Sequence, residues 1–411
     1  MNDCKSINTP VDCNLKLSKD DEGHLVDPKQ YKSLVRSLRS VSKSWKSLID
    51  SSEFIANYHF NNDQLQQHRV LVRYADPKVE KYVSIVDDDS FPRHKFPLIV
   101  PSNIRRLLGY DPSILGSSQG VICFCVDFGD STYWYYSGNE AKTFVLWNPT
   151  IQKSVPVVVP GLDDRNYRDF KNVYGFGVCP RTSVAKLVKV SYISDLIDID
   201  THTPQVEISS LSLGSWRRSS SMNVPRKCIQ LRQNHVCVDK CIYRYAFDRT
   251  VIGKTYHSKN LILSFDMTTE EFTEVQLCDG LKEEYSGDAY GCCGYLRLSK
   301  LGTSLVVLEP KDGLYKEISV WRMEHGVPNS FTKLFIIKSL IESLQINEVH
   351  GFRKTGEPII DTGMTTTDKN YIGDIVVYEP KSGEISDIGI TSAGCLYLAQ
   401  SYIETLVLHD H

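Results

Sequence analysis

A serine between two glycines is the first candidate for chemistry in this chain. Gly116-Ser117-Ser118-Gln119-Gly120 matches the Gly-x-Ser-x-Gly pattern that exposes a nucleophilic serine between a strand and a helix in hydrolases. Here Pro112–Leu115 precede the motif, and the apolar run Val121–Val126 follows where a helix should begin. The context argues against a hydrolase and predicts that the glycines are backbone positions at the entry of a strand.

Metal, redox and cofactor chemistry have equally little support. None of the 12 cysteines forms the paired Cys-x-x-Cys knuckles of a structural zinc site. Gly175-Phe176-Gly177 lacks the third glycine of a dinucleotide fingerprint. The histidines considered, which share no regular spacing, are His202, His235 and His257. We therefore expect buried thiols that act as small apolar side chains, and no metal, cofactor or catalytic residue.

Two further stretches are candidates for binding a partner protein. Tyr133-Trp134-Tyr135-Tyr136 lies in a long link, and aromatic residues are enriched at interface hot spots. The same run also fits a strand whose alternate side chains enter the core, and this alternative stays open. Asn166, Tyr167 and Arg168 belong to a second polar link, which is either a contact loop or ordinary solvated surface.

A hairpin pattern that recurs along the chain must position these residues. Leu261–Phe265 reads as a strand, Asp266–Glu270 as a polar turn, and Phe272–Val275 as the return strand. Related hairpins align on large apolar residues at intervals of 54 to 64 residues, namely Trp147, Leu211, Phe265, Trp321 and Tyr378. This period lies near that of kelch repeats, and one period has room for the four strands of a propeller blade. The sequence predicts an all-β, kelch-like β-propeller with six blades, preceded by a short helical segment.

The propeller should close between the two ends of the repeat region. Val70–Tyr74 and Lys81–Val86 form a hairpin around a turn at residues 75–78. The last apolar strand, Thr405–Leu408, is placed to complete the blade that begins near Val70, because closure removes an exposed sheet edge. A further strand is expected at Val236–Tyr245.

Composition limits the partners and the compartment. The net charge of −3 gives no reason to expect nucleic acid or an acidic membrane as a partner. The polar start lacks the apolar run of a secretory signal, and no stretch approaches the length of a membrane span. Cysteines without a signal imply reduced thiols. We expect a protein of the cytoplasm, the nucleus or both.

Residues 31–58 carry the helical pattern. Large apolar residues recur at steps of three and four and share one helix face: Leu34, Leu38, Val41, Trp45 and Leu48. Basic residues fall largely on the rest of the helix. A solvated basic face over an apolar docking stripe is favoured over nucleic-acid binding, because the stretch lacks the interleaved aromatics of a base-stacking surface.

The same stretch resembles a known module. Residues 38–54 are similar to the C-terminal half of a plant F-box, through which substrate receptors join SCF-type cullin–RING ubiquitin ligases by way of a SKP-family adaptor. The resemblance implies adaptor contacts at Leu38, Val41, Trp45, Leu48 and Ile49. The first half of an F-box is absent, and residues 9–39 instead resemble a segment of a copia-type retrotransposon polyprotein.

The repeat region resembles the plant F-box-associated interaction domain, a kelch-like module. The resemblance runs from about Gly116 to Leu408, and its clearest motifs are Gly116–Cys123, Trp147–Thr150 and Gly351–Glu357. The polar, charged composition of residues 1–30 predicts a disordered head. Together with the two resemblances, this divides the chain into that transposon-like head, a partial F-box helix over 31–60 and the propeller over 65–411.

The resemblance also implies a function. The chain would be the non-catalytic substrate-recognition subunit of an SCF-type E3 ubiquitin ligase, which binds a target protein through its propeller while the adaptor and cullin supply the link to ubiquitin transfer. The alternative is a propeller that binds protein partners but has lost the adaptor because its F-box is incomplete. An enzyme with its site at the centre of the ring would require a cluster of carboxylates or histidines on the inner strands, and the sequence shows no such cluster.

Overall fold

The structure is a computed structural model, and the chain divides into two compact units. The smaller unit holds Met1–Gln66 with Asp410, and the larger one holds Gln67–His409 with His411. Each is described by itself. The residues that the structure describes are 41–49, 51, 68–76, 79–100, 113–126, 143–159, 170–193, 204–210, 214–219, 225–252, 255–282, 284–287, 296–311, 317–324, 330–338, 346–365, 371–393, 398–405 and 407.

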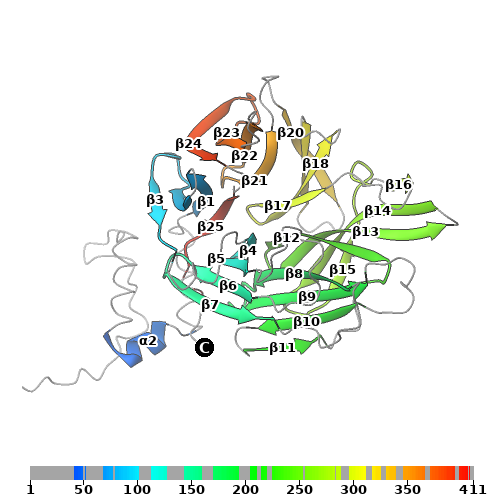
Figure 1. The fold of residues 1–411 in the computed structure, drawn as a ribbon, viewed down its shortest axis with the longest axis horizontal. Coiled ribbons are helices and arrows are strands. Elements are labelled where there is room, and N and C mark those ends of the chain that lie inside the picture. Colours follow the sequence, from blue (N-terminus) through cyan, green and yellow to red (C-terminus); the bar gives the residue numbers. More distant parts are fainter. Residues whose placement is uncertain are drawn as a thin grey trace, which may run out of the picture. The chain divides into compact units, whose positions relative to one another are not determined.

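Six antiparallel sheets make up the larger unit, and each is one blade of a propeller (Figure 1). In the order from the centre outward, blade 1 consists of β25 (Leu398–Ile403), β1 (His68–Asp76), β2 (Val79–Val86) and β3 (Lys95–Leu98). Blade 2 consists of β4 (Ser113–Ser118), β5 (Val121–Val126), β6 (Thr143–Asn148) and β7 (Lys153–Val158). Blade 3 consists of β8 (Phe170–Val178), β9 (Ala185–Ile193), β10 (Gln205–Ser210) and β11 (Ser215–Arg218).

The remaining blades follow the same plan. Blade 4 consists of β12 (Ile229–Val238), β13 (Cys241–Ile252), β14 (Thr255–Asp266) and β15 (Phe272–Val275), and β16 (Glu284–Gly287) also pairs with β14. Blade 5 consists of β17 (Arg297–Leu301), β18 (Ser304–Lys311), β19 (Glu317–Met323) and β20 (Phe331–Lys338). Blade 6 consists of β21 (Ile346–Phe352), β22 (Pro358–Thr365), β23 (Tyr371–Tyr378) and β24 (Ile385–Ala393). The predicted six-bladed, all-β propeller is confirmed.

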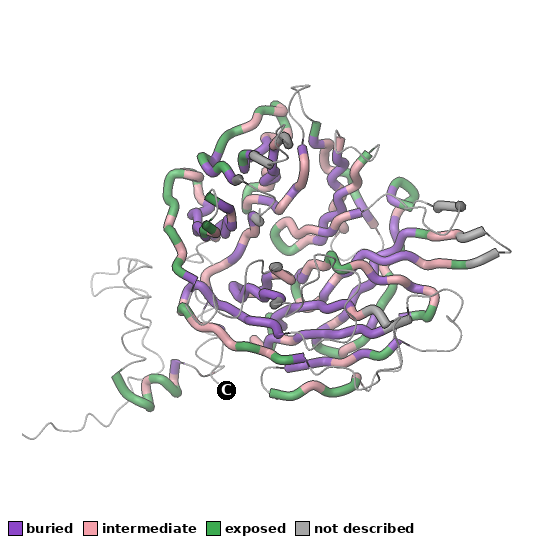
Figure 2. The backbone as a smooth tube through the Cα atoms, viewed as in Figure 1, coloured by how far each residue is buried: buried purple, intermediate pink, exposed green. Residues whose placement is uncertain are grey.

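Burial on both faces of the sheets explains why the strands are so apolar. Successive strand residues point to opposite faces, so Val70 of β1 packs toward blade 6 and Leu71 packs toward blade 2. Trp147 of β6 has no exposed surface and meets Tyr82 of blade 1 edge to face, with ring centroids 6.3 Å apart. Burying a side chain of this size contributes about 2–3 kcal/mol. Figure 2 shows buried residues along the strands of every blade, and exposed ones on outer strands such as β3 and β11.

The ring closes inside blade 1, where β25 pairs antiparallel with β1 and Val70 lies opposite Ser401. The prediction that a late strand completes the first blade is therefore confirmed, but its position was wrong. The closing strand is Leu398–Ile403, not Thr405–Leu408. Both segments are short and contain apolar residues, so the sequence alone does not distinguish them. Thr405 and Val407 instead offer backbone carbonyls to Asn148 of blade 2.

The predicted strand Val236–Tyr245 was also wrong, because it is two strands. Asp239 has a φ of 51° and forms the tight turn between β12 and β13 with Lys240. Aspartate tolerates this left-handed conformation better than most residues. The turn contains no glycine or proline, which is why the sequence pattern did not reveal it.

The predicted helix over residues 31–58 is not continuous within the described part of the small unit. Ser42 is non-helical and caps α2 (Lys43–Ile49): its Oγ accepts a hydrogen bond from the Trp45 N–H (3.2 Å) and its carbonyl accepts one from the Lys46 N–H (3.0 Å). Serine side chains favour this cap because they satisfy backbone donors that lack a helical partner. Ser51, beyond the helix end, is a bend. The head at residues 1–30 lies outside the described residues.

Each innermost strand ends on one face of the ring, which we call the turn face, and begins on the opposite loop face. Contacts between blades join these ends: the Val178 N–H donates to Ser118 Oγ (2.9 Å), and the side chains of Ser118 and Cys237 are 3.3 Å apart. Two-residue turns follow β4, β12 and β17 at this face. In blade 2, Val126 pairs with Thr143, which pairs with Val158, so these strand ends lie together at the loop face.

Candidate functional site: the two faces of the propeller

The stretches predicted to bind a partner join strand ends on the loop face. Tyr133, Trp134, Tyr135 and Tyr136 belong to the connection from β5 to β6, and Asn166, Tyr167 and Arg168 belong to the connection from β7 to β8. All seven lie outside the described residues, so their role stays a prediction. Val158, at the adjoining end of β7, has 61% of its surface exposed, and its carbonyl accepts a hydrogen bond from Trp216 Nε1 (2.9 Å). The flanking strand ends bring both connections to one side of the ring.

The residues predicted to contact an adaptor lie in or beside α2. Leu38 is outside the described residues. Val41 precedes the helix and is 67% exposed, Trp45 and Leu48 are half-buried, and Ile49 is buried. Trp45 and Leu48 are three residues apart and therefore face the same side of the helix. The adaptor contact itself stays a prediction.

On the turn face, the Trp147-Asn148-Pro149-Thr150 motif holds the end of the chain. Asn148 has no exposed surface, and its Nδ2 donates to the carbonyls of Thr405 (3.0 Å) and Val407 (2.7 Å). Its Oδ1 accepts a hydrogen bond from the Thr150 N–H (2.8 Å). A side-chain amide suits this place because it supplies donors and an acceptor together. The motif fastens blade 2 to the segment that follows the closing strand.

The Gly-x-Ser-x-Gly motif serves the same closure. The structure places it on strand β4, a turn and strand β5, not on the strand–turn–helix of a hydrolase. Gly120 has a φ of +74°, and a Cβ at this position would lie 2.5 Å from Thr405 Oγ1. Glycine is required there for both its conformation and its lack of a side chain. Gly120 directly precedes β5, as predicted, whereas Gly116 lies inside β4.

His235 is an important residue that the spacing of the histidines did not reveal. It lies on β12, and its Nε2 accepts a hydrogen bond from the Phe176 N–H of β8 (3.1 Å). A Cβ at Gly116 of β4 would lie 3.2 Å from the same nitrogen, so three innermost strands meet at this imidazole. Burial, aided by the charge of Arg244, lowers the pKa of His235 to about 3. The ring is therefore neutral at pH 7 and acts as a fixed acceptor. A glycine in each neighbouring strand would have been the signal to look for.

The sequence of most of this propeller matches the model of a known protein family. The family model of the F-box associated beta propeller domain matches residues 135–404, which is more than half of the chain. The chain belongs to the F-box associated beta propeller family. The matched segment ends one residue after β25 and so includes the strand that closes the ring. No curated protein matches the chain at a significant level.

Solved structures give only distant matches to this F-box associated propeller. The Hadza microbial sialidase Hz136 shares 8% identity with a TM-score of 0.39, over 78% of this chain and 73% of the sialidase. The putative TolB from Agrobacterium tumefaciens shares 8% identity with a TM-score of 0.31, over 82% and 98% of the two chains. AofleA from Arthrobotrys oligospora shares 9% identity with a TM-score of 0.33, over 84% and 92%. Similarities at this level say nothing about the activity of the propeller.

Three thiols of the F-box associated propeller, those of Cys123, Cys237 and Cys241, are held in their neutral form. Burial raises the pKa of Cys123 and Cys237, and burial together with the charge of Asp266 raises the pKa of Cys241 to about 11. Thiols with raised pKa values are poor nucleophiles and poor metal ligands at pH 7. In the described part of the chain, no three His, Cys, Asp or Glu side chains gather closely enough to hold a metal ion. Within the same residues, no helix has the length and apolar character that crossing a bilayer requires.

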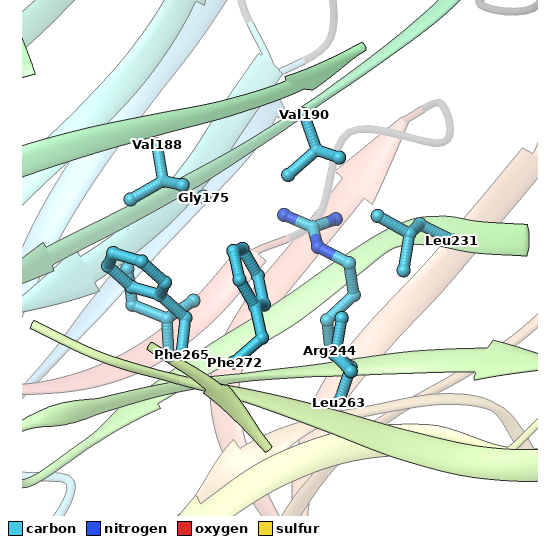
Figure 3. Close-up of a pocket in the computed structure, with 9 residues that line it drawn as sticks. Gly175, Val188, Val190, Leu231, Arg244, Leu263, Phe265 and Phe272 are labelled. Atoms are coloured by element: carbon cyan, nitrogen blue, oxygen red, sulfur yellow. The ribbon is translucent and has the colours of Figure 1, made fainter. Parts of the chain in front are cut away.

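One cavity lies between blades 3 and 4, and Figure 3 shows its lining. Valines of β9, Leu263 and Phe265 of β14, and Phe272 of β15 surround the space, into which the Arg244 guanidinium extends. Arg244 donates to the backbone carbonyls of Tyr174, Arg232 and Gln233, so its donors serve to join β8 to β12. The space for the centres of water-sized molecules is about 20 Å³, enough for one or two waters. Small-molecule sites are far larger. The cavity is a feature of the packing between blades.

Proposed function

We propose that the chain is the substrate-recognition subunit of an SCF-type cullin–RING E3 ubiquitin ligase, with a target protein bound by the propeller. The observation that carries the proposal is membership of the F-box associated beta propeller family. The family name links this propeller to proteins that carry an F-box, and residues 38–54 resemble the C-terminal half of that module. In this role, the propeller selects the target, and other subunits perform the ubiquitin transfer.

Two properties of the propeller support target binding on the loop face. Long connections, such as residues 127–142 and 159–169, join strand ends there, whereas the innermost strands end in short turns on the opposite face. Long loops on a rigid scaffold are where binding residues concentrate. Tyr133–Tyr136 and Asn166–Arg168 supply aromatic and polar side chains of the kinds that form interface hot spots.

Adaptor binding is proposed to use the apolar residues in and beside α2. The exposed Val41 and the half-buried Trp45 and Leu48 provide apolar surface that the described part of the small unit leaves open to contact. Exposed apolar side chains that gather on one element are typical of protein interfaces.

Co-purification with a SKP-family adaptor tests the proposal. The full-length chain should retain the adaptor, and the double variant Trp45→Ala, Leu48→Asp should lose it. Lys43→Ala, an exposed residue of the same helix, serves as the matched control and should bind as the unchanged chain does. Circular dichroism checks that each variant keeps its strands. Failure of the unchanged full-length chain to bind any SKP-family adaptor would reject the ligase role and favour a propeller that binds partners outside a ligase.

A further inference from the structure

Blade 4 carries a hairpin that is longer than its innermost strand. β13 and β14 contain 12 residues each and pair along their whole length without a bulge. The innermost strand β12 begins at Ile229, which lies opposite Asp248, so the hairpin continues past the loop-face end of β12. We call the part beyond it the arm, which consists of residues 249–252 of β13 and 255–258 of β14. Figure 1 shows β13 and β14 extending outward from the ring, beside β16.

The two edges of the arm differ. On the β14 edge, β16 adds a further antiparallel strand, with Tyr285 opposite Ser258. On the β13 edge, the last neighbour is Cys228, whose carbonyl accepts a hydrogen bond from the Arg249 N–H (3.0 Å). Among the residues that the structure describes, no strand pairs with β13 beyond that point except β14. The arm therefore has one covered edge and one open edge.

The backbone of Val251 points to the open edge. Successive residues of a strand direct their N–H and C=O groups to opposite sides. The Arg249 N–H points toward Cys228, so the backbone groups of Thr250 point toward β14 and those of Val251 point away from it. A strand that lay along this edge would find one donor and one acceptor at Val251. Unpaired backbone groups at a sheet edge are the template to which an extended segment adds.

The open edge lacks the features that protect the outer edges of the blades. Native sheets prevent strand addition by prolines, charges, short edge strands and bulges. The outermost strands of the ring have such features, namely Pro97 in β3, Pro156 in β7, a length of four residues in β11 and β15, and bulges where β20 pairs with β19 and β24 with β23. Thr250, Val251 and Ile252 are all uncharged and β-branched, which are properties that favour strands. This edge is thus suited to accept a strand.

We propose that the arm binds an extended, uncharged segment of the target protein, rich in β-branched residues, which adds as a strand to β13 at Val251. The inference rests on the proposed function, because the arm continues past the loop-face end of blade 4 and so extends the face proposed to hold the target. β16 provides a precedent within the chain, since it adds to the other edge of the same arm.

The size of the edge favours a target segment over a second copy of the chain. An open edge of a few residues offers far less than the area that a stable dimer buries. For a target that the loop face also contacts, strand addition at the arm is a second, intramolecular contact, which raises the affinity without a large area of its own.

Hydrogen–deuterium exchange and a peptide library test this edge in the full-length chain. In the free chain, the Val251 amide should exchange faster than the Thr250 amide, which points toward β14. Random peptides displayed on phage are selected on the unchanged chain, and the selected peptides are synthesised with a fluorescent label. We expect peptides rich in β-branched residues, whose binding is measured by fluorescence anisotropy and slows exchange at Val251.

Proline at the centre of the edge separates loss of binding from loss of folding. Val251→Pro removes the N–H at the open edge and should weaken peptide binding by about ten-fold or more. Proline is tolerated where the N–H of an edge strand faces solvent, so this variant should unfold in urea as the unchanged chain does. Val251→Thr keeps the N–H and the β-branched side chain, and it is the matched control with unchanged binding. Thr250→Pro removes an N–H that points toward β14 and should unfold at a lower urea concentration.

Several results would overturn the proposal. They are a Val251 amide as protected as that of Thr250 in the free chain, the selection of no peptide, and equal peptide binding by Val251→Pro and the unchanged chain. Dimerisation of the unchanged chain that Val251→Pro abolishes, measured by analytical ultracentrifugation, would assign the edge to a second copy instead of a target. Failure to bind the adaptor would reject the ligase role but leave these measurements intact, because none of them involves the adaptor.

Discussion

The hydrogen bonds of Asn148 with Thr405 and Val407, which we call the latch, allow a direct test of how the ring is closed. Its side chain is hydrogen-bonded at a position with no exposed surface: Nδ2 donates to the carbonyls of Thr405 and Val407 and to Thr405 Oγ1 (3.3 Å), and Oδ1 accepts from the Thr150 N–H. Asn148→Asp keeps the shape and the Oδ1 acceptor but replaces the bonds to the two carbonyls by repulsion between a carboxylate and two carbonyl oxygens. Asn148→Leu removes all of these bonds and keeps a similar volume.

The expected loss of unfolding free energy follows from the number of buried polar groups that are left without hydrogen-bond partners. A buried polar group that loses its partner costs about 1–3 kcal/mol. Asn148→Leu leaves two carbonyls and one N–H without hydrogen-bond partners, which should lower the free energy of unfolding by about 3–6 kcal/mol. The lower end applies if water reaches the carbonyls. Asn148→Asp leaves the same two carbonyls without donors and also buries a charge, so at pH 7 it should lower the free energy of unfolding at least as much as Asn148→Leu does. Losses of this size are a large part of the stability of a domain.

Equilibrium unfolding in urea measures this loss, with the fluorescence of the buried Trp147 among the signals. Gln152→Glu is the matched control, because the Gln152 amide also donates to a carbonyl in the same hairpin (Pro149, 2.9 Å) but the residue is exposed. Water can replace the bond from Gln152 to the Pro149 carbonyl, so Gln152→Glu should lower the free energy of unfolding by less than about 0.5 kcal/mol. If Asn148→Asp unfolded within the error of the unchanged chain, the latch would be irrelevant to closure and the reasoning would be refuted.

Two further predictions concern the turn face. Gly120→Ala should lower the free energy of unfolding by about 2 kcal/mol more than Gly302→Ala does. Both glycines have a positive φ, but only at Gly120 would a Cβ overlap Thr405. Equal losses for the two variants in urea unfolding would contradict this. The second prediction concerns the stability of the protein in acid. The pKa of His235 is about 3 in the folded state and 6.5 in the unfolded state, so the unfolded state binds more protons below pH 6.5. The stability that the neutral imidazole contributes is therefore complete above pH 6.5 and is lost as the pH falls. From pH 7.5 to pH 5 the free energy of unfolding should fall by about 2 kcal/mol because of His235, and the His235→Asn variant should lose about that much less over the same range. Identical profiles of unfolding free energy against pH in the two proteins would refute this prediction.

The repeat could be predicted because it depends on local patterns. Trp147, Phe265, Trp321 and Tyr378 lie on β6, β14, β19 and β23, which are the third strands of their blades. Residues at equivalent positions face equivalent environments, so large apolar residues recur there with the period of the blade. The hairpin at residues 261–275 was predicted correctly for the same reason, since its turn residues and its apolar strands are adjacent in the sequence.

The closing contacts could not be predicted in this way. The bond from Asn148 to Val407 joins residues 259 positions apart. No periodicity within one blade encodes which side chains meet across the ring. The position of β25 was wrong for this reason, because the choice between Leu398–Ile403 and Thr405–Leu408 depends on the partner β1 and on the latch.

The Gly-x-Ser-x-Gly residues that first suggested chemistry, and Asn148 beside them, therefore serve to join blades and to hold the end of the chain. Ser118 accepts from the Val178 N–H, Gly120 makes room for Thr405, and Asn148 holds the segment after β25. A toroid of small sheets needs such contacts because its first and last strands are distant in sequence and must find each other before the ring is stable. Motifs with the letters of an active site can thus recur in this fold for structural reasons. We expect recognition to use residues that closure does not, such as those of the long connections on the loop face.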